Sequence, residues 1–132
     1  MSATHLPRIK RAYDSPAESD GTRILVDRIW PRGLTKQRAA VDIWFKEIAP
    51  TPQLRVWFGH APERWQSFRD QYLQELRSNP ASVDRLLELA SGGVITLLYA
   101  ARDPDHNHAI VLADYLASIQ SGADIITPPP PG

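Results

Sequence analysis

The 132-residue chain contains no cysteine and only one methionine, and its charges cancel, because 15 Lys and Arg balance 15 Asp and Glu. Without cysteine it can form no disulfide, thiolate metal site or cysteine nucleophile. Zero net charge argues against a general nucleic-acid or membrane binder, although it is compatible with a local basic patch. No stretch approaches the roughly 18 apolar residues that cross a bilayer, and the N-terminus lacks the apolar run of a secretory signal. We therefore expect a soluble, cytoplasmic protein.

The length predicts one compact domain with a real hydrophobic core. Four of the 12 prolines stand together at positions 128–131, where fixed φ angles and missing N–H groups favour an extended polyproline conformation. We predict a single domain over residues 1–126 and a flexible, proline-rich tail over residues 127–132. Such a tail is typical of a frayed terminus, and it also suits a proline-reading domain as a ligand.

Three segments have the composition of strands. Residues 6–13 mix apolar and basic side chains in loose alternation, and residues 22–29 place apolar residues on alternate sides. Residues 94–99 are almost continuously apolar, which is typical of a central strand covered on both faces. Because helical segments precede and follow this last strand, we expect parallel pairing with right-handed crossovers.

The region between the second and third predicted strands has a helical period. We expect about two helical turns over residues 42–48, a short helix ending at Gly59, and longer helices over residues 62–79 and 80–92. A last helix follows Asp105. The sequence thus predicts an α/β fold, with a small, mostly parallel sheet of three or four strands packed with several helices in one domain.

The segment after the second predicted strand is basic. Ligands of open α/β sheets bind beyond the carboxyl ends of the strands, and Arg28, Arg32 and Lys36 stand there with Trp30. These cations suit a carboxylate or a phosphate, and the indole offers a stacking wall. The structural alternative is that Asp27 pairs locally or caps a turn, while the indole covers the core.

The segment after the third predicted strand carries Tyr99, Asp103, His106 and His108. A histidine suits proton transfer near neutral pH, Asp103 is close enough in sequence to orient one, and Tyr99 offers a hydroxyl. On a helix, His106 and His108 would point about 200° apart, so we expect no metal site. The alternative is that Asp103 and Asp105 cap the following helix.

Aromatic residues crowd the middle of the chain, where all four tryptophans lie between positions 30 and 65. Trp65, Phe68 and Tyr72 keep the spacing of a helix that faces a core. Aromatic side chains beside arginines also suit a base-stacking surface. His60, at the start of a helix, either donates to an anion or fills a gap between two aromatic-rich helices.

Several blocks of the sequence resemble one family. They are residues 10–14, 25–33, 54–60, 96–103 and 107–109, and the Trp-Pro-Arg-Gly and Trp-Phe-Gly-His motifs within them are specific. In order from about residue 8 to 116, they resemble the bacterial DUF488 family and its short YeaO-like branch, which is of unknown function. The resemblance implies that Tyr99 and the Asn-His-Ala step at 107–109 stand where longer relatives carry a cysteine and a Cys-His-Arg step. Only His108 is retained from that step, so a thiolate mechanism does not carry over.

Two functions follow from these observations. The first is a site for a small anionic or phosphate-bearing ligand at the carboxyl ends of the strands, with a cofactor-free hydrolytic or transfer step if the protein is an enzyme. The predicted ligand-binding residues are Arg28, Trp30, Arg32, Lys36 and His60. The predicted catalytic residues are His108, Asp103 and Tyr99.

The second function is a non-catalytic nucleic-acid or protein-binding module using the basic loop, which the charge balance disfavours. The sequence implies no cofactor, no metal and no membrane partner, and it leaves the oligomeric state open.

Overall fold

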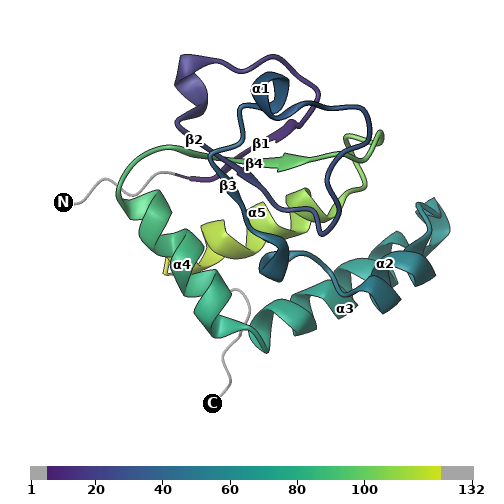
Figure 1. The fold of residues 1–132 in the computed structure, drawn as a ribbon. Helices are drawn as coiled ribbons and strands as arrows, with labels where there is room; N and C mark the ends of the chain where they lie inside the picture. The colour runs from purple at the N-terminus through teal and green to yellow at the C-terminus, as the bar shows by residue number, and fades with distance from the viewer. Residues whose placement is uncertain (1–5, 123–132) are drawn as a thin grey trace.

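The computed structural model describes residues 6–122 as an α/β fold built on one parallel sheet (Figure 1). The strands in these residues are β1 (Arg8–Arg11), β2 (Thr22–Leu25), β3 (Ile43–Trp44) and β4 (Ile95–Tyr99). They lie in the order β1-β4-β2-β3, and every pairing is parallel. The predicted fold class is confirmed, and the almost continuously apolar strand β4 is buried along its whole length inside the sheet.

The two faces of this sheet are covered unequally. The helices are α1 (Lys36–Ala39), α2 (Pro52–Phe58), α3 (Trp65–Arg77), α4 (Pro80–Ser91) and α5 (His108–Gln120), with single 3-10 turns η1 (Glu18–Asp20), η2 (Lys46–Ile48) and η3 (Pro62–Arg64). In Figure 1, α1 lies on one side of the sheet, and α3, α4 and α5 lie on the other. No helix within residues 6–122 is long and apolar enough to cross a membrane.

The larger hydrophobic core lies between the sheet and the three long helices. Ile95, Leu97 and Tyr99 of β4 are buried in it, because successive strand residues point to opposite faces. Tyr72 of α3 is fully buried, and its hydroxyl donates a hydrogen bond to the carbonyl oxygen of Ile48 at 2.7 Å. That bond fixes the segment after β3 against α3, and the same segment forms one wall of the site described below.

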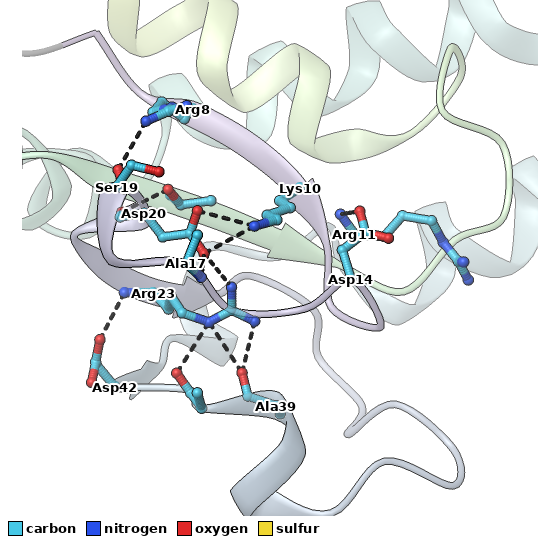
Figure 2. Close-up of polar contacts among 12 residues, drawn as sticks. Arg8, Lys10, Arg11, Asp14, Ala17, Ser19, Asp20, Arg23, Ala39 and Asp42 are labelled. Atoms are coloured by element: carbon cyan, nitrogen blue, oxygen red, sulfur yellow. Dashed lines mark hydrogen bonds and ion pairs between the residues drawn. The ribbon is translucent and has the colours of Figure 1, made fainter.

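The opposite face of the sheet holds a buried ionic cluster beneath α1 and the loops (Figure 2). Asp20 and Arg23 are each only 3% exposed, and Arg23 Nη1 lies 2.6 Å from Asp20 Oδ2. Arg23 Nε and Nη2 also donate to the carbonyl oxygen of Ala39, at the end of α1. Lys10 Nζ, from β1, lies 3.1 Å from both carboxylate oxygens of Asp20. The cluster therefore ties β1, β2 and α1 together where few apolar side chains are available.

Residues 42–48 form a short strand and a single 3-10 turn, so the expectation of two helical turns there is wrong. Strand β3 pairs with the open edge of β2 and is followed by the single turn η2. Hydrogen bonds from Asp42 N to Arg23 O and from Phe45 N to Leu25 O, both 2.8 Å, extend the pairing. The β-branched and aromatic side chains of this segment suit a strand, and pairing with β2 overrides the short helical pattern.

The other predicted elements are present with shifted ends. The helices expected at Gly59, over residues 62–79 and over residues 80–92 correspond to α2, to η3 with α3, and to α4. Strand β2 ends at Leu25, although a strand was expected to continue to residue 29. The predicted boundary at residue 126 and the proline-rich tail lie outside the described residues.

Candidate functional site

A cavity of about 350 Å³ lies beyond the carboxyl ends of the strands. The chain leaves β2 toward α1 and leaves the neighbouring β4 toward α5, on the other face of the sheet (Figure 1). A crevice opens where two adjacent connections diverge in this way. The basic segment after β2 and the histidine-containing segment after β4 both line this cavity, together with parts of α2 and α3.

Three arginines line the cavity, and two of them are available to a ligand. Arg28 donates from Nε to the carbonyl oxygen of Pro50 at 3.2 Å and from Nη2 to that of Ala49 at 3.1 Å, so it holds the segment after η2 in place. Arg32, after β2, and Arg55, on α2, are exposed. Within residues 6–122 their guanidinium groups make no hydrogen bond or ion pair. Each of these two groups can offer a planar set of N–H donors to an anion.

Asp27 is the one carboxylate that lines the cavity among the described residues. Its Oδ2 accepts a hydrogen bond from the backbone N–H of Ala100 at 3.1 Å, which joins the ends of β2 and β4. Its Oδ1 lies 3.1 Å from His108 Nε2, yet it is buried without a well-aligned hydrogen bond. The His108 nitrogen is closer to the carbonyl oxygen of Val26, at 2.9 Å. The charge of Asp27 is thus engaged with the sheet and with His108.

Asp103 orients a different histidine, His106. The Oδ2 atom of Asp103 lies 2.9 Å from His106 Nδ1, and its Oδ1 accepts hydrogen bonds from the backbone N–H groups of Asp105 and His106. The Asp105 N–H, followed by the His106 ring, lowers the pKa of Asp103. Trp65 meets the imidazole edge-on, with ring centroids 5.3 Å apart. Because the carboxylate stays ionised, it holds the His106 ring through Nδ1 and leaves Nε2 as the other polar atom of that ring.

Helix α5 is capped by neither of the two aspartates considered for that role. The side chain of Asn107 accepts a hydrogen bond from the backbone N–H of Ile110 at 3.2 Å. Its Nδ2 donates to the carbonyl oxygen of Asp103 at 3.0 Å. Asn107 therefore begins the helix and also anchors the turn that carries the Asp103–His106 pair.

Aromatic rings form the apolar part of the cavity wall. Phe58 and Phe68 line it and stack with their centroids 4.4 Å apart. His60 also lines it, with a left-handed φ of 58°, which is uncommon for a residue other than glycine. Trp30 is held by a hydrogen bond of 2.6 Å from its Nε1 to the carbonyl oxygen of Leu34. The indole therefore both covers the smaller core around Leu34 and forms part of the wall.

Five of the eight predicted site residues line this one cavity, and three do not. The five are Arg28, Trp30, Arg32, His60 and His108. The other three are Lys36, Tyr99 and Asp103. Lys36 is exposed at the start of α1. Tyr99 is buried in the core, where burial raises the pKa of its phenol, so its hydroxyl is protonated at neutral pH. Asp103 does not line the cavity, but it orients His106, which does.

Comparison with known proteins identifies the family. The model of a family described as the inactive DUF488-N3 subclade matches residues 7–127. The chain is 47% identical to the uncharacterised protein YeaO of Escherichia coli over 110 residues, which are 83% of this chain and 96% of that protein. It belongs to the DUF488 family. It is also 41% identical to the uncharacterised protein Rv3073c of Mycobacterium tuberculosis over 109 residues, 83% of this chain and 92% of that protein. No solved structure matches the chain significantly.

The predicted site residues of this DUF488 protein did not include Arg55, Asp27 or His106, which also line the cavity. Arg55 lies on a separate helix, and only its position two residues before the Trp-Phe-Gly-His motif could have indicated it. Asp27 was considered for a local structural role alone, because its hydrogen-bond partner Ala100 follows a different strand, β4. His106 was considered only as one of the two histidines that Asp103 could orient, and the Asp103 carboxylate lies against it.

Proposed function

We propose that this DUF488 protein binds a small anionic ligand in the cavity beyond the carboxyl ends of β2 and β4, and that it does so without catalysing a reaction of the ligand. Binding without catalysis is supported by the description of the matching subclade as inactive. The positions of the predicted catalytic residues also support it, because these residues do not meet at one place. Tyr99 lies in the core, Asp103 faces His106, and the Nε2 atom of His108 faces Val26 and Asp27.

The observation that carries the proposal is the pair of unpaired guanidinium groups of Arg32 and Arg55 at one cavity. They come from two different elements, the loop after β2 and helix α2, so an anion between them would be contacted from two sides. Arg28 adds positive charge, while Asp27 adds the one negative charge among the described lining residues. Guanidinium groups recognise phosphate and carboxylate oxygens through pairs of charge-assisted hydrogen bonds.

The test is a thermal-shift and calorimetric titration of the full chain with inorganic phosphate and with phosphate monoesters, in a chloride buffer. A ligand that binds only the native state must raise the melting temperature. A hydrogen bond to a charged group contributes about 1.5–3 kcal/mol, so Arg32→Gln and Arg55→Gln should each weaken binding roughly 10- to 100-fold. The matched control is Arg85→Gln, because Arg85 is an exposed arginine on α4 that does not line the cavity. Equal affinities in all three variants would overturn the proposal.

The alternative of a nucleic-acid-binding module has less support, because the positive and negative charges of the chain cancel, whereas such modules are usually basic. It makes a separate prediction. Affinity for a DNA oligonucleotide would fall steeply with salt, and Arg32→Gln or Arg55→Gln would make that fall shallower, because fewer DNA phosphates would be neutralised. We expect no such affinity at physiological salt.

A further inference from the structure

Three histidines line the cavity, and the hydrogen-bond partners of two of them, His106 and His108, leave lone pairs, and not N–H groups, for a ligand. The Nδ1 atom of His106 faces the ionised carboxylate of Asp103 at 2.9 Å, so Nδ1 carries the proton of the neutral ring. Its Nε2 atom is then an acceptor, and it makes no hydrogen bond with any residue from 6 to 122. The side chain is 38% exposed at the cavity, so a ligand can reach this ring.

His108 has the same property for a different reason. Its Nε2 atom lies between two acceptors, the carbonyl oxygen of Val26 at 2.9 Å and Asp27 Oδ1 at 3.1 Å. Nε2 must therefore carry the proton, and Nδ1 is left as the acceptor, again without a hydrogen bond among the described residues. A bare anion would bring its own lone pairs against both rings, whereas a hydroxyl group would donate to them.

We propose that the ligand is a hydroxyl-bearing phosphate monoester, whose phosphate lies between Arg32 and Arg55 and whose hydroxyl donates to His106 Nε2. The proposal rests on the function proposed above and specifies its ligand. A phosphate has enough terminal oxygens to accept hydrogen bonds from two guanidinium groups at once. A cavity of about 350 Å³ is at the small end of the range for ligand sites, which suits a polyol or sugar phosphate more than a larger molecule.

The experiment compares n-propyl phosphate with glycerol 3-phosphate, which has the same three-carbon skeleton with two added hydroxyls. Calorimetry is done at pH 8, where an ordinary imidazole is neutral. Because a neutral hydrogen bond contributes about 0.5–1.5 kcal/mol, we expect glycerol 3-phosphate to bind roughly 2- to 12-fold more tightly than propyl phosphate. His106→Phe keeps an aromatic ring beside Trp65 but has no lone pair, so it should bring the ratio of the two affinities close to one. Arg55→Gln should weaken both ligands and preserve their ratio.

Each other result has a distinct meaning. Equal affinity of the two phosphates for the native chain would overturn the hydroxyl contact and leave the anion site intact. A preference that survives in His106→Phe would overturn the assignment to His106. Glycerate binding as tightly as glycerol 3-phosphate would overturn the choice of phosphate over carboxylate. If none of the three compounds bound to a protein that still had its native melting curve, the proposed function itself would be overturned.

Discussion

Removal of the Asp20 carboxylate is expected to destabilise the fold strongly, because it leaves a buried cation without its counter-ion. Asp20→Ala removes the oxygen that lies 2.6 Å from Arg23 Nη1, and both side chains are only 4% exposed. It also removes the acceptor for the backbone N–H of Ala17, at 2.9 Å, and for Lys10. Breaking one side of a buried ion pair costs about 3–5 kcal/mol, a large share of the roughly 5–15 kcal/mol by which a native domain is stable.

Urea unfolding followed by circular dichroism measures this loss. The midpoint should fall while the slope with denaturant is unchanged, because the surface exposed on unfolding is nearly the same. Asp84→Ala, at an exposed position on α4, is the matched control and should stay within about 0.5 kcal/mol of the native chain. Adding Arg23→Met to Asp20→Ala should cost less than the sum of the two single changes, because the orphaned charge is then removed. A loss below about 1 kcal/mol for Asp20→Ala would refute the reasoning.

The same cluster predicts a dependence on pH. Burial alone raises the pKa of Asp20, but the Ala17 N–H and the Lys10 and Arg23 side chains outweigh it, so the pKa is lowered from its ordinary value of 3.8. A carboxylate with a lowered pKa in the folded state contributes stability that is present above 3.8 and is lost as the pH falls through the folded value. Below about pH 4 the native chain should therefore lose stability faster than Asp20→Ala does, as unfolding curves at about pH 7, 4 and 3 would show.

Four further substitutions test the packing of the fold, each by urea unfolding. Gly21→Ala should cost more than about 3 kcal/mol, because φ is +64° and an added Cβ would stand 2.1 Å from the carbonyl oxygen of Val94; Gly33→Ala, with φ of +76° but open space, should cost only about 1 kcal/mol. Asn107→Ala removes the cap of α5 and should cost about 1 kcal/mol. Tyr72→Phe removes one buried hydrogen bond and should cost about 1 kcal/mol without changing the affinity for phosphate esters. A neutral result for Gly21→Ala would contradict the close approach of the two backbones.

The elements that sequence reasoning predicted well are those whose own side chains create the pattern. Strand β4 is almost continuously apolar because it is covered on both faces, so its burial could be read directly from residues 95–99. Helix α4 begins with Pro80, and α2 ends just before Gly59, as local backbone preferences require. Strand β3 was not predicted, because it is only two residues long and its existence depends on pairing with the open edge of β2.

Sequence reasoning predicted the part of the site that lies in the segments just after the strands. Arg32 and His108 lie in the segments that follow β2 and β4, so parallel pairing alone brings those segments to one edge of the sheet. Lys36 continues the same basic run, but the chain has by then turned into α1, and its exposed side chain does not line the cavity. Arg55 reaches the cavity only because α2 packs beside α3, and no local pattern records that packing.

The amino-acid sequence by itself determined the α/β class, the order of most helices and strands, and the basic character of the segment after β2, since each of these depends on neighbours along the chain. The tertiary structure decided which aspartate faces which histidine, which arginines stay unpaired, and that Asp20 and Arg23 meet beneath α1. Those choices depend on distances between residues from different elements, and such distances exist only once the sheet has formed and its two faces have been covered.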